Sequence, residues 1–149
     1  MKVTIGEVIA LVIILTALSA GFLSATPTTS SHTLTIIPTS AITKFLGGSW
    51  SLNYSYVGTG YNAKLIFLQS YKNSQVVYET LTDPAGDELI ILYVYPSSHG
   101  VTSVYSTGYV VLYSAYKGNA YVMINYVGNT TAVSVSQIES LANYIISTE

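Results

Sequence analysis

The chain begins with an apolar run, residues 6–25, whose sequence is GEVIALVIILTALSAGFLSA. Glu7 lies near its start, and the run contains no other charged residue. A helix needs about 20 apolar residues to cross a bilayer, whereas the core of a signal peptide has about 7 to 15. The length therefore favours a transmembrane anchor in residues 1–25, with a cleaved signal segment as the alternative.

The charges around this run predict its orientation. Lys2 and the terminal amine precede the run, and the next positive charge is Lys44. Because cytoplasmic flanks carry an excess of lysine and arginine, we expect the N-terminus in the cytoplasm and the rest of the chain outside the membrane. If the segment is a signal that is removed, the rest of the chain is secreted.

Residues 26–33, TPTTSSHT, show no apolar periodicity and are dense in proline, serine and threonine. This composition is typical of a solvated spacer. We therefore expect a linker at 26–33 and one extracytoplasmic domain at 34–149.

From Ser49 onward the apolar positions alternate with polar ones. Trp50, Leu52, Tyr54 and Tyr56 recur at every second residue, which predicts a strand with these large side chains on one face. Further strand-like runs are expected at 33–37, 63–71, 75–81, 88–95, 109–116 and 120–127, whereas 101–106 fits either a strand or one helical turn. The short Pro- and Gly-containing links between the runs predict an antiparallel meander. The link at 117–119, Lys-Gly-Asn, gives the clearest hairpin.

Helical spacing appears at both ends of this domain. Pro38 precedes Ile42, Phe45 and Leu46, and two glycines follow, which is the polarity of a short helix. Near the C-terminus, Ser136 and Glu139 have the spacing of a capping box.

An apolar stripe follows that box, so a C-terminal helix should pack on the sheet with Glu139 and Asn143 outward; the stripe is Ile138, Leu141, Ala142 and Ile145. The predicted fold class is α+β. It has an N-terminal hydrophobic helix, a short helix, an antiparallel sheet and a C-terminal helix on that sheet.

The composition excludes several classes of function. Charged residues make up 8% of the chain, against about 25% in typical domains, and the net charge is −2. The five lysines do not cluster, so nucleic acid is not expected as a partner. The absence of cysteine excludes disulfides and thiolate chemistry. A fold with so few ion pairs loses little stability in acid, which suggests an acidic habitat as a hypothesis.

No catalytic, metal or cofactor motif stands out, and we expect the protein not to be an enzyme. The only acidic cluster is Asp83, Asp87 and Glu88, and the sequence has no G-x-S-x-G nucleophile motif. A small secreted hydrolase that uses this cluster as an acid pair is the third functional hypothesis.

Two sequons and many tyrosines indicate what the surface of the domain could bind or carry. Asn53 and Asn129 begin N-x-[S/T] sequences and are candidate glycosylation sites. The 14 tyrosines fit strand packing, and the alternative is an adhesive or carbohydrate-contacting surface.

The residues Ile5-Gly6-Glu7-Val8-Ile9-Ala10, followed by an apolar helix with small residues, resemble the N-terminal segment of archaeal type IV pilin-like proteins. The resemblance implies that the helix bundles with its copies in a filament core while a β-rich head faces outward. It also implies that Glu7 pairs with a neighbour's N-terminal amine during assembly. The Ser/Thr/Tyr-rich composition is similar to that of surface proteins of thermoacidophilic archaea and their viruses.

These observations predict a membrane-anchored extracytoplasmic protein of the cell envelope with a structural or binding role. The first alternative is a pilin-like filament subunit. The expected partners are the membrane, through the N-terminal helix, and either further copies of the chain or an envelope protein or glycan.

Overall fold

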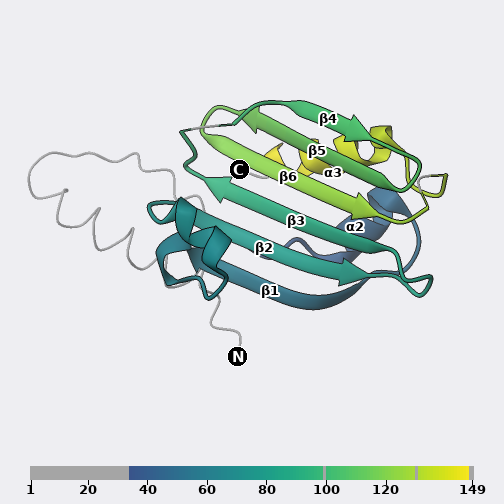
Figure 1. Ribbon diagram of the computed structural model, residues 1–149, viewed down its shortest axis with the longest axis horizontal. Helices are drawn as coiled ribbons and strands as arrows, with labels where there is room; N and C mark the ends of the chain where they lie inside the picture. The colour runs from purple at the N-terminus through teal and green to yellow at the C-terminus, as the bar shows by residue number, and fades with distance from the viewer. Residues whose placement is uncertain (1–33, 99, 130, 148–149) are drawn as a thin grey trace, which may run out of the picture.

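The computed structural model describes residues 34–98, 100–129 and 131–147 (Figure 1). The elements in chain order are α2 (Thr39–Leu46), β1 (Ser51–Thr59), the 3-10 helices η1 (Gly60–Asn62) and η2 (Ile66–Tyr71), β2 (Gln75–Thr82), β3 (Glu88–Tyr95), β4 (Ser103–Ser106), β5 (Val110–Lys117), β6 (Ala120–Val127) and α3 (Val135–Ser147). The described part is therefore α+β, as predicted. The apolar helix expected at 6–25 and the linker at 26–33 lie outside the described residues. Within the described ranges, no helix combines the length and the apolar character needed to cross a bilayer.

The sheet has six antiparallel strands in the order β1-β2-β3-β6-β5-β4. Antiparallel pairing is confirmed, but the strands form two meanders, β1 to β3 and β4 to β6, which join where β3 pairs with β6. Burial accounts for this order. Val122, Ile124 and Tyr126 of β6 are fully buried and belong at the centre of the sheet, whereas every residue of the short β4 is exposed and suits an edge.

Both α-helices lie behind the sheet in the view of Figure 1, on one face that we call the helix face. The main core lies between them and the sheet and includes Leu81, Leu89, Ile91, Ile124 and Tyr126. The opposite face is covered at one end by η1 and η2, where Leu68 packs with a smaller cluster of strand residues. The rest of that face carries no helix of the described chain.

The C-terminal helix is confirmed with its apolar stripe. Ile138, Leu141 and Ala142 are fully buried, and Glu139 and Asn143 point to solvent. The capping box, however, is two residues earlier than predicted: Ser134 Oγ accepts from the Gln137 N–H at 3.2 Å, and Gln137 Oε1 accepts from the Ser134 N–H at 2.8 Å. Glutamine serves at the third helical position as well as glutamate does.

The short helix α2 is also confirmed. It follows Pro38 and buries Ile42 and Leu46. Gly47 ends it with a φ of 73°, a left-handed conformation that favours glycine.

The prediction that Trp50, Leu52, Tyr54 and Tyr56 share one face is wrong. Leu52 pairs with Leu81 and Tyr54 pairs with Thr80, so that Asn53 is the extra residue of a β-bulge. A bulge reverses the alternation of side chains beyond it. As a result Trp50 packs in the helix-face core, whereas Tyr56 packs against the cluster on the opposite face.

Two segments expected as strands adopt other structures. In the run at 63–71, Ile66–Tyr71 forms the 3-10 helix η2. Residues 34–38, which we call the strap, have no regular secondary structure and cross the helix face, where the Ile37 N–H donates to Glu79 Oε1 at 2.6 Å. The ambiguous run at 101–106 contains β4.

The predicted hairpin at 117–119 is confirmed. Lys117 pairs with Ala120, which leaves Gly118 and Asn119 as a two-residue turn. Gly118 has a φ of 61°, as the first central residue of a type II′ turn requires.

Candidate functional site

A groove of about 700 Å³ lies between α3 and β5 on the helix face. Its lining residues come from α2, the loop before β4, β5 and α3: Phe45, Thr102, Tyr113, Ala115, Tyr116, Lys117, Glu139, Ser140, Asn143, Tyr144, Ile146 and Ser147. The groove therefore joins segments that are far apart in the sequence.

One side of α3 forms a wall of the groove. Glu139, Ser140, Asn143, Tyr144 and Ser147 recur at the spacing of helical turns and so share one side of the helix. They lie next to the buried apolar stripe that fixes α3 on the sheet. This wall is polar except for the Tyr144 ring, and Ile146 of α3 adds a second apolar side chain to the groove.

The floor of the groove is β5. Tyr113 and Ala115 are both on the helix face of this strand and are 6% exposed. Burial raises the pKa of the Tyr113 phenol, and the nearby negative charge of Glu139 raises it further. Tyr113 therefore stays a neutral hydroxyl, able to donate or accept a hydrogen bond, over the whole range in which the domain would work.

Aromatic rings surround the end of the groove next to α2. Phe45 and Tyr144 are in ring contact, with centroids 5.3 Å apart and planes tilted by 42°. Tyr116 also borders the groove, but its hydroxyl donates to the Ser97 carbonyl at 3.0 Å, and its ring lies beside Gly100. The half-buried rings of Phe45 and Tyr144 are therefore available to a ligand, whereas the Tyr113 ring is buried in the floor.

This lining suits a neutral, polar ligand with apolar edges. Lys117 and Glu139 are the charged residues of the groove, and their formal charges cancel. The remaining polar groups are hydroxyls and one amide. The Ser140 and Ser147 hydroxyls donate to carbonyls of α3 and can still accept from a ligand hydroxyl, and the Asn143 amide can donate or accept. Aromatic rings provide flat apolar surface beside them.

The acidic cluster is built into a turn. Asp83 Oδ1 accepts from the N–H groups of Ala85 at 3.0 Å and Asp87 at 2.9 Å. Asp87 Oδ2 accepts from the Tyr126 hydroxyl at 2.7 Å. Both carboxylates thus hold the loop between β2 and β3, and the part of the chain that the structure describes contains no group of three or more residues arranged to hold a metal ion.

Both sequon asparagines are on the surface. Asn53 is exposed at the bulge, and its amide donates to Thr82 Oγ1 at 3.2 Å. Asn129 is exposed in the loop before α3, where its Oδ1 accepts from the Thr131 N–H at 3.0 Å. Access for a glycan exists at both positions, and glycosylation stays a prediction. Intact mass before and after deglycosylation tests it, and an unchanged mass contradicts it.

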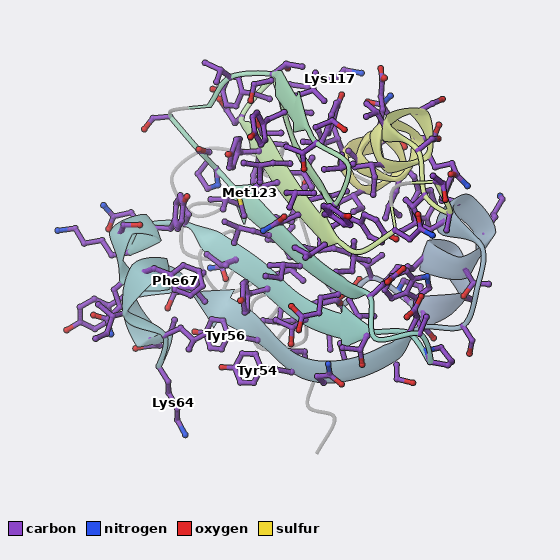
Figure 2. The ribbon with its side chains drawn as sticks, turned by 45° about the vertical axis from the view of Figure 1, so that its right-hand side comes forward. Tyr54, Tyr56, Lys64, Phe67, Lys117 and Met123 are labelled. Atoms are coloured by element: carbon purple, nitrogen blue, oxygen red, sulfur yellow. The ribbon has the colours of Figure 1, made fainter. Side chains whose placement is uncertain are left out.

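Most tyrosines serve packing. Of the 14 in the chain, the exposed ones are Tyr54, Tyr61, Tyr105 and Tyr109. Tyr78 shows the usual arrangement, since the rings of Tyr54 and Phe67 contact it edge to face at centroid distances of 6.0 Å and 5.2 Å. Figure 2 shows Tyr54 and Tyr56 along β1, with Phe67 on the neighbouring η2.

Glu79 is the residue that the sequence interpretation missed. It is 0% exposed, and Oε2 has no hydrogen-bond partner among the described residues. Burial raises the pKa of this carboxyl to about 7, although the hydrogen bond from the Ile37 N–H lowers the pKa in part. A signal was present: Glu79 alternates with Val77 and Leu81, so it occupies the inward phase of β2.

Glu7, the predicted assembly residue, lies outside the described residues. No protein-family model matches the chain, and a search of curated proteins found no significant relative. Function must therefore be argued from the residues themselves.

Proposed function

We propose that this chain is a membrane-anchored extracytoplasmic binding protein of the cell envelope, without enzymatic activity, whose groove between α3 and β5 holds a neutral glycan chain. The observation that carries the proposal is the groove lining. It places the rings of Phe45, Tyr113 and Tyr144 beside the amide of Asn143 and the hydroxyl of Ser140.

A sugar ring has apolar C–H faces and a rim of hydroxyls. The faces match aromatic rings, and the hydroxyls match a lining of amide, hydroxyl and carboxylate groups. A charged polymer would find no net charge in this groove, because Lys117 and Glu139 offset each other. The lining thus favours a neutral glycan over an acidic or basic one.

Location at the envelope is supported by the sequence. The apolar run at 6–25 is long enough to span a bilayer, and Lys2 precedes it. The sequons Asn53 and Asn129 are both exposed, which is compatible with a glycosylated outer surface.

A titration tests the binding proposal. The full chain in detergent micelles is titrated with neutral hexose and N-acetylhexosamine oligosaccharides while amide resonances are followed by NMR. We expect shifts that saturate and that are confined to α3, β5 and the region of Phe45.

Asn143→Ala should weaken binding about fivefold, since a hydrogen bond to a ligand is worth about 1 kcal/mol. Alanine is tolerated in a helix, so the fold should survive. Asn73→Ala is the matched control, because Asn73 is exposed in the turn before β2. If no oligosaccharide shifts the groove resonances, or if both variants bind equally, the glycan proposal is wrong.

A further inference from the structure

One end of the sheet differs from the other in charge. The strand register places Gln75 opposite Tyr95 and Val94 opposite Tyr121, so that η1, η2 and the β5–β6 hairpin lie at the same end. Three exposed lysines are found there: Lys64, Lys72 and Lys117. We call this region the basic end.

The opposite end carries three acids. Asp83 and Asp87 lie in the turn between β2 and β3, and Glu88 begins β3. By contrast, residues 60–74 at the basic end contain two lysines and no acid. These lysines and these acids are therefore separated along the direction of the strands, whereas Glu139 lines the groove beside Lys117 and Lys44 lies on α2.

The basic end also exposes large apolar side chains. Ile66 is 81% exposed, Tyr61 is 72% exposed and Phe67 is 50% exposed. Ile66 and Phe67 are exposed because η2 buries only Leu68 against the sheet, and Tyr61 lies in η1, where only Gly60 is buried. Figure 2 shows Lys64 extending from the same segment that carries Phe67. Apolar and aromatic side chains that alternate with lysines are typical of a surface that rests in a lipid interface.

The path of the chain agrees with this placement. The strap runs behind the sheet toward α2 (Figure 1), and β1 then starts at Ser51, which pairs with Thr82 beside the acidic turn. The strap thus travels away from the basic end. The start of the strap is therefore its end nearer the basic end, and the predicted anchor precedes the strap in the sequence.

We propose that the basic end lies against the anionic headgroups of the membrane that holds the chain, with Ile66 and Phe67 in the interface. This inference rests on the membrane anchoring of the proposed function. Lysines are attracted to anionic lipid, and the acidic end would then point away from the membrane. The groove between α3 and β5 would lie along the side of the domain, with Lys117 at its membrane-facing end, and a glycan chain could reach it from that side of the domain.

A single-probe experiment tests the orientation. The chain contains no cysteine, so that one introduced cysteine takes one spin label. Ile66→Cys is labelled in the full chain, and Ala85→Cys, exposed in the acidic turn, is the matched control. Both are reconstituted in vesicles of phosphatidylcholine with phosphatidylglycerol, and collisions with oxygen and with a water-soluble nickel complex are measured.

We expect the label at 66 to collide more with oxygen and the label at 85 to collide more with the nickel complex. Adding Lys64→Gln and Lys72→Gln, or omitting phosphatidylglycerol, should move the label at 66 toward the aqueous response.

The possible failures can be told apart. If the chain does not float with vesicles, both the anchoring and this inference are wrong. If it floats and position 66 is as aqueous as position 85, only the orientation is wrong. If position 66 is shielded from both reagents, the basic end binds protein, such as a second copy, and the lipid assignment is contradicted.

Discussion

At the scale of single residues, Glu79 makes the stability of the fold depend on pH. Its pKa is about 7 in the folded chain against an ordinary value of 4.5. The unfolded chain therefore releases this proton at a lower pH than the folded chain does. The contribution of Glu79 to the unfolding free energy is most favourable below about pH 4.5, falls as the pH rises to about 7, and is constant above that.

The interval between the two pKa values corresponds to about 3 kcal/mol. We predict that Glu79→Gln removes this part of the pH dependence, because glutamine does not titrate. Denaturant titration at about pH 4 and about pH 8 gives the unfolding free energies of both chains and so checks this prediction. An unchanged difference between the two conditions would show that the carboxyl is hydrated in the folded state. A confirmed difference would also agree with the acidic habitat suggested by composition.

Tyr126 provides a second residue-scale prediction. It is fully buried, and its hydroxyl is 2.7 Å from Asp87 Oδ2 and 3.0 Å from the Asn129 carbonyl oxygen. Burial raises the pKa of this phenol, and the hydrogen bond to Asp87 raises it further. Tyr126→Phe removes a part-buried hydrogen bond to a carboxylate and should cost about 1 to 3 kcal/mol of stability.

Tyr105→Phe is the control for that measurement, because Tyr105 is exposed on the edge strand β4. In thermal unfolding, the melting temperature of Tyr126→Phe should be clearly lower than that of Tyr105→Phe. Equal melting temperatures would contradict a structural role for the Tyr126 hydroxyl.

At the scale of elements, periodicity predicted α3, α2 and the β5–β6 hairpin because each depends on local spacing and local turn residues. The bulge at Asn53 was not predictable in the same way. The sequence around it alternates regularly, and only the pairing of β1 with β2 shows that one residue is extra. The 3-10 helix η2 was missed because residues 65–68, Leu-Ile-Phe-Leu, form a continuous apolar run that fits a buried strand as well as a helix.

The capping box gives the prediction that belongs to this scale. Ser134→Ala removes the side chain that accepts from the Gln137 N–H, and should destabilise the domain by about 1 kcal/mol. Ser136→Ala should have little effect, since Ser136 lies inside α3 on its exposed side. Denaturant unfolding compares the two. A larger loss for Ser136→Ala would restore the cap predicted from the sequence.

At the scale of the whole molecule, neither the strand order nor the groove could be predicted from the sequence. The groove unites Phe45, Thr102, β5 and α3, and their proximity follows from β6 taking the place beside β3. The fold class could be predicted from the sequence, because apolar periodicity alone predicts which elements share a core. Glu79 could be predicted only in part. The sequence places it in the inward phase of β2, but its burial depends on the strap that covers it.

The two proposed roles of the N-terminal run differ in what they predict for Glu7. If the run is a simple anchor, Glu7→Gln should leave membrane localisation intact, since a glutamate near the interface costs an anchor little. If the chain is a pilin-like subunit, the same change should abolish filaments. Electron microscopy and membrane fractionation of both chains distinguish the two, and filaments formed by Glu7→Gln would contradict the assembly role of that residue.

The measurement that tests the central claim most directly is labelling of intact cells that produce the full chain with Ala85→Cys. A membrane-impermeant maleimide reaches this cysteine only if the domain is outside the membrane. The proposed function predicts that the chain is labelled before the cells are lysed. After lysis, the labelled chain should sediment with the membranes. Labelling that requires lysis would contradict the extracytoplasmic location, and with it the envelope role.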